Sequence, residues 1–223
     1  MSIRRQLEKT LRQHLGFAEV TWPTFGMQVK VGDAARSGRD GFEFSGLGNL
    51  LQRYDLDPER YQPMEEAPSI DIEFSHQVSR SSSLAAQYRA GQTDVKVDLH
   101  FETDTAFYLF VPKARIRSLR DVDSLASDLH RASQSQGNRV RLRERIVYKT
   151  IEAEGPGTLL MSQGRNTRAQ LGADLGKKGG VLQLSGASGN VTQLNVEGPS
   201  SVFAFGVFRL AVGRRHYVLD PVD

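Results

Sequence analysis

Apolar and polar residues alternate one by one from Asp94 to Glu102, which is the clearest periodic pattern in the chain. The apolar set is Val95, Val97, Leu99 and Phe101, and the residues between them are Lys96, Asp98, His100 and Glu102. A period of two predicts a β-strand with one apolar and one polar face. The charges stop at Ala106, so the strand through Val111 is predicted to be covered on both faces. The alternation suits a soluble sheet and also a transmembrane barrel with a wet lumen, and the pattern leaves both open.

Further strands are predicted on both sides of this stretch. Residues 69–78 alternate in the same way, and 84–88 are predicted to resume a strand, which gives an antiparallel meander from 70 to 111. A strand is predicted over 139–151. Residues 155–198 are rich in glycine with short apolar pieces between, which indicates a second long hairpin, and 201–212 reads as a buried strand.

Helical signals are fewer. Ser2 is a plausible N-cap for a helix to Leu15, Ser45 for a short helix through Tyr54, and a capping box at Ser118 for a helix over 119–132. Residues 36–40 are predicted to be a polar loop, and 55–68, with three prolines, to lack regular structure. Together these elements predict an α+β fold, a twisted, mostly antiparallel sheet with peripheral helices.

Composition indicates an ordinary soluble chain. Of 223 residues, 39% are hydrophobic and 25% charged, and no apolar run approaches the about 18 residues of a membrane helix. The charged N-terminus does not resemble a signal peptide, so we expect a cytoplasmic protein. The absence of cysteine excludes disulfides, thiolate metal sites and a cysteine nucleophile, and a net charge of +3 favours anionic partners.

Three groups of residues are candidates for binding. Basic residues flank the apolar stripe of the first helix and would be either a solvated face or a contact for acidic lipids: Arg4, Arg5, Lys9 and Arg12. Four arginines share one face of the 139–151 strand, where acidic neighbours or bound phosphates would have to neutralise their charges: Arg139, Arg141, Arg143 and Arg145. Trp22 and Phe25 lie near the tip of a turn, as core residues or as an interfacial anchor.

Catalytic motifs are weak. The five histidines form no His-Glu-x-x-His pattern, and Gly172–Lys178 falls short of a phosphate-binding loop by one residue and lacks its Ser or Thr. Gly46-Leu47-Gly48 lacks the third glycine of a dinucleotide site. We therefore expect no enzyme, metal or cofactor.

The order of features from Arg145 to Val212 resembles the pore-forming domain of gasdermins. Ile146–Thr150 resembles the strand that leads into the long, glycine- and charge-rich hairpin of that family. Gly198–Leu210 resembles the small-residue and Ala-Phe strand that follows. Asp94–Leu129 fits as well, with a strand, an apolar Phe-Tyr-Leu-Phe strand and a helix. The chain is most similar to the shorter bacterial and fungal members.

This resemblance implies a cell-death or defence effector that is cytoplasmic when inactive and membrane-bound when active. It would bind acidic lipids, form a homo-oligomer and insert two β-hairpins per subunit, within about 70–110 and 139–208. The resemblance also implies headgroup contacts for the basic first helix and an anchoring loop at Trp22 and Phe25. Val95, Val97, Leu99 and Phe101 would lie on an inserting strand.

The resemblance also bears on how activity would be controlled. Residues 1–212 would be a single pore-forming domain, and the tail, 213–223, an inhibitory remnant. No cysteine near the N-terminus is available for acylation. Control would then fall to the tail, to a partner protein or to an activating protease, for which Arg214-Arg215 is a candidate site. The alternative is a soluble β-rich module whose arginine strand binds an acidic polymer or partner protein; for the pore-former, no nucleic-acid partner is expected.

Overall fold

The structure, a computed structural model, has the predicted α+β fold. It describes residues 3–15, 19–20, 29–38, 41–43, 48–61, 63–65, 69–92, 94–135, 144–155, 157–174, 182–196, 201–212 and 217–221. The helices are α1 (Ile3–Leu15), α2 (Leu50–Arg53), α3 (Leu84–Arg89) and α4 (Val122–Ser135). The strands are β1 (Glu19–Val20), β2 (Ala34–Gly38), β3 (Gly41–Glu43), β4 (Pro63–Glu65), β5 (Ile70–His76), β6 (Val78–Arg80), β7 (Asp94–Phe101), β8 (Phe107–Leu119), β9 (Glu144–Ala153), β10 (Gly157–Ser162), β11 (Thr167–Asp174), β12 (Leu182–Ser188), β13 (Val191–Val196), β14 (Ser201–Val212) and β15 (Tyr217–Pro221).

The chain divides into two compact units, and each is assembled from three separate segments. Unit 1 contains Met1–Met27, Ala67–Arg115 and Glu152–Phe203; unit 2 contains Gln28–Glu66, Ile116–Ile151 and Ala204–Asp223. Strands β8, β9 and β14 each begin in one unit and end in the other. Neither unit is therefore a continuous stretch of sequence.

Unit 2 packs α2 and α4 on a small sheet. Within it β2 pairs with β3 and β9, β4 with β8, and β15 with β14, all antiparallel. The core contains Tyr61, Leu125, Leu129 and Ile146, each at most 1% exposed. These side chains come from a turn, a helix and a strand that are far apart in the sequence.

Helix α4 begins at Val122, three residues later than predicted. Leu119 is the last residue of β8 and is buried there, because β8 runs through the position where a capping box at Ser118 was expected. Asp121 is the capping residue instead: its Oδ1 accepts a hydrogen bond from the amide of Ser124 at 2.9 Å. The capping-box motif is present in the sequence, but strand pairing in the sheet determines where helix α4 begins.

Three smaller predictions in unit 2 were wrong. Helix α2 is capped by Asn49, whose side chain accepts from the amide of Leu51, and not by Ser45. Residues 36–38 belong to β2 and not to a loop, since Arg36 pairs with Glu43 and Glu144. Pro63–Glu65 forms β4 within a segment predicted to be irregular, at a sheet edge where a proline is tolerated.

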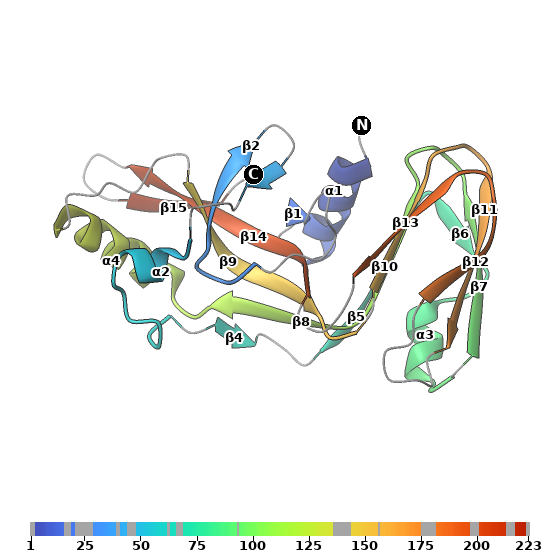
Figure 1. The fold of residues 1–223 in the computed structure, drawn as a ribbon, viewed down its shortest axis with the longest axis horizontal. Helices are drawn as coiled ribbons and strands as arrows, with labels where there is room; N and C mark the ends of the chain where they lie inside the picture. Colours follow the sequence, from blue (N-terminus) through green and yellow to red (C-terminus); the bar gives the residue numbers. More distant parts are fainter. Residues whose placement is uncertain are drawn as a thin grey trace. The chain divides into compact units, whose positions relative to one another are not determined.

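Two groups of four antiparallel strands in unit 1 follow the same lateral order (Figure 1). One group, called here the proximal sheet, is part of the eleven-stranded sheet and has the order β13-β10-β8-β5. The other, the distal sheet, has the order β12-β11-β7-β6. Each strand of the distal sheet therefore continues, after a short interruption, a strand of the proximal sheet.

Helix α1 forms as its spacing predicts. Leu7 and Leu11 are fully buried, while the exposed side includes Arg5, Lys9 and Arg12, called here the α1 cations. The helix meets the end of β5, where Gln6 Nε2 lies 3.3 Å from His76 Nδ1. His76 in turn stacks on Phe107, with ring centroids 5.8 Å apart.

Candidate functional site

Two long β-hairpins form the candidate site. Hairpin 1 comprises residues 70–114, with β5 and β6 as its outer arm and β7 and β8 as its inner arm. Hairpin 2 comprises residues 157–196, with β10 and β11 as its inner arm and β12 and β13 as its outer arm. The two inner arms pair with each other in both sheets. The second long hairpin that the glycine-rich sequence predicted is thus confirmed.

The inner arms keep one register across the interruption between the sheets. Phe107 faces Met161 in the proximal sheet, and Phe101 faces Thr167 in the distal sheet. Five residues separate these pairs in each arm, 102–106 in one and 162–166 in the other, and the amide of Ser162 donates to the carbonyl of Ala106 at 3.0 Å. Extending both arms would therefore require no slip between them.

The outer arm of hairpin 1 does not match its inner arm. His76 faces Phe107 and Val78 faces Phe101, so only Gln77 lies opposite the five residues 102–106. Gln77 has a φ of 51°, its carbonyl accepts from the amide of Glu102, and its side chain accepts from Thr103 Oγ1. The inner arm thus has four residues in excess, folded into a hydrogen-bonded turn.

Helix α3 covers the apolar face of the distal sheet. On β7 the predicted alternation is confirmed: Val95, Val97, Leu99 and Phe101 are at most 2% exposed. They pack with Ala169 and Leu171 of β11 and with Leu84 and Ala85 of α3. The prediction that 84–88 resumes a strand was wrong, because Ser83 caps a helix there by accepting from the amide of Ala86.

A single carboxylate holds the N-terminus of α3. Glu73 projects from β5, its side chain only 6% exposed, and four other groups donate to it besides Arg80 Nη1 at 2.5 Å. Its oxygens accept from the hydroxyls of Ser83 at 2.5 Å and Tyr108 at 2.7 Å, and from the amides of Leu84 and Ala85 at 3.1 and 3.0 Å. These amides belong to the first turn of a helix, which has no internal partners for them.

The protonation states of this cluster follow from its contacts. Burial alone would raise the pKa of Glu73, but hydrogen bonds from Ser83, Tyr108 and the Ala85 amide, with the charge of Arg80, hold it below its ordinary value. Burial and the neighbouring Glu73 charge raise the pKa of the Tyr108 phenol. At neutral pH the cluster therefore contains a carboxylate facing a neutral phenol.

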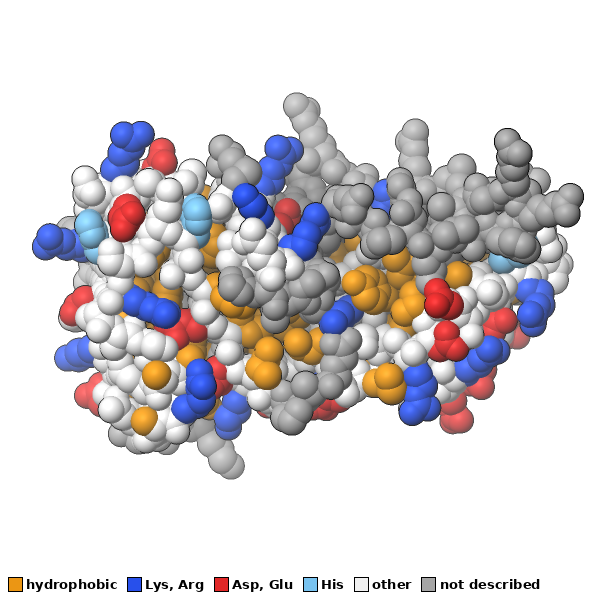
Figure 2. Space-filling model, turned by 180° about the vertical axis from the view of Figure 1, so that it is seen from behind, with side chains coloured by type: hydrophobic (Ala, Val, Ile, Leu, Met, Phe, Trp, Pro, Cys, Tyr) orange, Lys and Arg blue, Asp and Glu red, His pale blue; other side chains and the backbone are white. Residues whose placement is uncertain are grey.

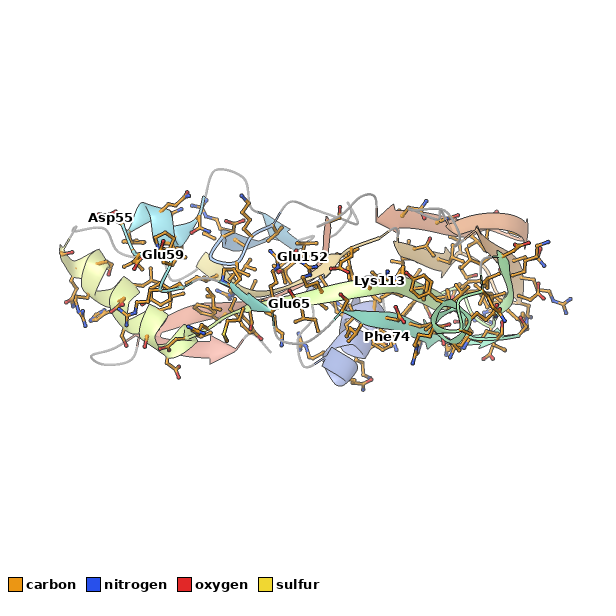
Figure 3. All side chains as sticks on the ribbon, turned by 90° about the horizontal axis from the view of Figure 1, so that it is seen from below. Asp55, Glu59, Glu65, Phe74, Lys113 and Glu152 are labelled. Carbon is orange, nitrogen blue, oxygen red and sulfur yellow. The ribbon has the colours of Figure 1, made fainter. Side chains whose placement is uncertain are left out.

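The C-terminal end of α3 is held more loosely. Arg89 lies 3.4 Å from Asp71 but is 71% exposed, so solvent screens this ion pair. Lys113, labelled on its strand in Figure 3, places its ammonium 5.9 Å from the centre of the Tyr88 ring. The buried Glu73 contacts are thus the main polar attachment described for the helix.

The opposite face of the distal sheet is polar and open. A groove of about 620 Å³ crosses it, lined among others by Ser79, Asp98, His100 and Arg168. Asp98 accepts from Gln170 Nε2 of the neighbouring strand at 2.9 Å. On the molecular face shown in Figure 2, described basic side chains are interspersed with acidic ones.

The remaining predicted binding residues are placed only in part. The α1 cations are exposed on one helix, on which Arg4 also lies. Arg145 is half-buried on β9, where it faces Ala35; Arg139, Arg141 and Arg143 lie outside the described residues, as do Trp22, Phe25, Arg214 and Arg215. Of the predicted arginine face, the structure therefore describes Arg145 alone.

Sequence reasoning missed the Glu73 cluster. Ser83 followed by Leu-Ala-Ala-Gln-Tyr-Arg, with Gly91 at a φ of 74° just beyond, is a cap, a run of mostly good helix formers and a stop signal, so α3 could have been found. Nothing local marks Glu73 itself, which lies ten residues before its serine partner. Only the folded hairpin brings these residues together.

The comparisons with known proteins give structural similarity and no match in sequence. No family model matches the chain, and no curated protein matches it. Among solved structures it is similar to the cryo-EM structure of the Gasdermin A3 membrane pore, over 99% of this chain and 94% of that chain, with 12% identity and a TM-score of 0.39. The similarity spans nearly the whole chain and is low by both measures.

The described residues contain neither a membrane-spanning helix nor a cluster of metal-binding side chains. None of the helices there is long and apolar enough to cross a membrane. The described His, Asp and Glu side chains form no group of three or more that could hold a metal ion.

Proposed function

We propose that this chain is a gasdermin-like pore-forming protein that binds acidic lipids, oligomerises and inserts its two hairpins into a membrane. The observation that carries the proposal is the mismatch of four residues between the arms of hairpin 1. The mismatch is an even number, so removing it moves the outer arm without turning its faces over.

Consider hairpin 1 extended in the register of β5 and β8 alone. Leu84 would then face Leu99, Ala86 would face Val97 and Tyr88 would face Val95. Helix α3 would become the continuation of β6, and Arg89 would face Asp94 across a four-residue turn that contains Gly91. A turn of this length is common in β-hairpins.

Both arms alternate in this extended register. The outer arm would place on one face Ile70, Ile72, Phe74, His76, Val78, Arg80, Ser82, Leu84, Ala86 and Tyr88. Its other face would carry Asp71, Glu73, Ser75, Gln77, Ser79, Ser81, Ser83, Ala85, Gln87 and Arg89. One face is mainly apolar and the other mainly polar, and the polar residues on the apolar face are His76, Arg80 and Ser82.

Such an arm suits a membrane barrel. A tilted spanning strand needs about 9–11 residues with one face to lipid and one to a wet lumen, and this arm has that alternation over a longer distance. The inner arms already share a register that survives extension. Since an open sheet edge is not tolerated in lipid, insertion requires several copies to close a barrel.

The α1 cations are the described candidates for the lipid surface. They are exposed, and each cation close to an anionic membrane contributes about 1 kcal/mol of attraction. The headgroup and anchoring roles of Arg4, Arg139, Arg141, Arg143, Arg145, Trp22 and Phe25 are part of the same proposal, as is a cytoplasmic inactive form.

Dye release tests the proposal. The full chain is added to dye-loaded vesicles with and without phosphatidylserine, and oligomers are examined by chemical cross-linking and negative-stain microscopy. Release from anionic vesicles, together with ring- or arc-shaped oligomers, is the expected result. Anionic vesicles that bind the protein and keep their dye would overturn it, and steeply salt-dependent binding to an acidic polymer without release would favour a soluble binding module.

A further inference from the structure

Glu73 is placed to decide when hairpin 1 can extend. Its carboxylate connects three elements: β5, on which it lies, β8 through Tyr108, and the N-terminus of α3 through Ser83, Leu84 and Ala85. Extension as proposed above requires α3 to leave the apolar face of the distal sheet. All the α3 contacts of Glu73 would have to break before the helix could unwind.

We propose that Glu73 is the latch of the pore-forming transition, a positioning residue whose charged carboxylate keeps α3 folded over Val97 and Leu99. This inference rests on the proposed function and names the residue that regulates it. The carboxylate serves as the missing acceptor for two first-turn amides and places a negative charge at the helix N-terminus. From strand β5 it thereby adds to the cap that Ser83 provides, for a helix of six residues that would be only marginally stable by itself.

The other polar attachments of α3 are too exposed to take this role. Arg89, which pairs with Asp71, is 71% exposed, whereas the Glu73 side chain is 6% exposed. Water can replace a partner at the exposed pair, but a buried donor whose acceptor is lost has no substitute. Loss of the Glu73 charge should therefore loosen α3, while loss of the Arg89 pair should not.

Amide hydrogen exchange measures directly how firmly Glu73 holds the first turn of α3, and it needs no membrane. In Glu73→Gln the side chain keeps its size, but an NH2 group takes the place of one carboxylate oxygen, on which two donors converge at Oε2 and three at Oε1, so one acceptor becomes a donor. We expect the Leu84 and Ala85 amides to exchange at least about tenfold faster, because a hydrogen bond to a charged group is lost. Glu102→Gln is the matched control, since Glu102 is exposed on the same hairpin and, among the described residues, its carboxylate accepts a weak hydrogen bond from Ser79, at 3.4 Å. The two amides should exchange there as in the wild type.

A milder variant distinguishes loss of the latch from general unfolding. Tyr108→Phe removes one donor to Glu73 and should shift the same amides in the same direction by less. Amides of β8 and β10, which pair with each other in the proximal sheet, should keep their wild-type protection in all three variants. Unchanged exchange at Leu84 and Ala85 in folded Glu73→Gln would overturn the latch.

The pH dependence has a defined sign. Because the pKa of Glu73 is depressed in the folded state, the latch is fully formed above the ordinary carboxyl pKa and is lost as pH falls through the lower folded value. The groups facing it are Arg80 on β6 and the neutral phenol of Tyr108 on β8, with the neutral donors of Ser83 and α3. Acid should thus lower the protection factors of the two amides, that is, the intrinsic exchange rate at each pH divided by the observed rate, in the wild type, and leave those of Glu73→Gln with little further change.

Dye release separates the latch from the function it regulates. If the wild type releases dye, Glu73→Gln should release it faster and Glu102→Gln at the wild-type rate. Faster amide exchange in Glu73→Gln without release by any variant would retain the latch and overturn the pore. Release by the wild type with unchanged exchange and rate in Glu73→Gln would retain the pore and overturn the latch.

Discussion

A disulfide between β6 and β7 should stop hairpin 1 from extending. Ser79 and His100 face each other on the polar side of the distal sheet, and facing Cα atoms in an antiparallel pair lie about 4.5–5.5 Å apart, within the range that a disulfide spans. A shift of four residues at about 3.3 Å per residue moves one strand along the other by about 13 Å. This is about twice the longest Cα separation a disulfide allows, about 6.8 Å, so the bond and the shift exclude each other.

The assay is dye release by Ser79→Cys/His100→Cys before and after oxidation. The chain has no cysteine of its own, so no other thiol competes. Oxidation should reduce release to background and a reductant should restore it. The control is Asp98→Cys/Gln170→Cys, which joins β7 to β11 in the register that extension preserves, and its oxidised form should release dye within about twofold of its reduced form. Release by the oxidised Ser79/His100 pair at the reduced rate would refute the four-residue shift, and a block in the control would refute the preserved inner register.

Three further predictions concern lipid binding and stability. Changing all three α1 cations to glutamine should weaken binding to phosphatidylserine vesicles by about 100-fold, at about 1 kcal/mol per cation, as measured by co-sedimentation; binding unchanged at low salt would contradict their role. Asp128→Ala should lower the free energy of unfolding by about 1–3 kcal/mol, because the Tyr61 hydroxyl, which now donates to Asp128 at 2.5 Å, would lose its acceptor. Burial and Asp128 raise the pKa of Tyr61 to about 12, and ultraviolet titration of the variant should find this pKa shifted back toward 10. Gly206→Ala should cost about 1–3 kcal/mol in chemical denaturation, because its new Cβ would lie 2.9 Å from a ring carbon of Tyr148, whereas Gly186→Ala, with open space around it, should have no such effect.

The sequence predicted those elements whose pattern and environment agree. Ser201–Val212 was expected as a buried strand and is β14, and the stripe of α1 buries Leu7 and Leu11 as its spacing requires. Failures occurred where tertiary pairing overrode local signals. Leu119 belongs to β8 because β4 pairs with it there, and a capping box alone cannot register that partner. The sequence did not predict the candidate site for the same reason, since Glu73 meets Ser83 and Tyr108 only after two strands have paired.

The error at 84–88 has a physical explanation that bears on the mechanism. Leu84, Ala86 and Tyr88 alternate with Ala85 and Gln87, which suits one apolar strand face. Leu84 and Tyr88 are also four residues apart, which suits one side of a helix. In the structure the helix prevails, because Ser83 caps it and Glu73 accepts its first amides. If these polar contacts are lost, the same side chains can instead lie beside Val95, Val97 and Leu99 in a strand, on the apolar face that the proposal turns toward lipid. The segment is therefore compatible with two backbone conformations, and a few buried hydrogen bonds select between them.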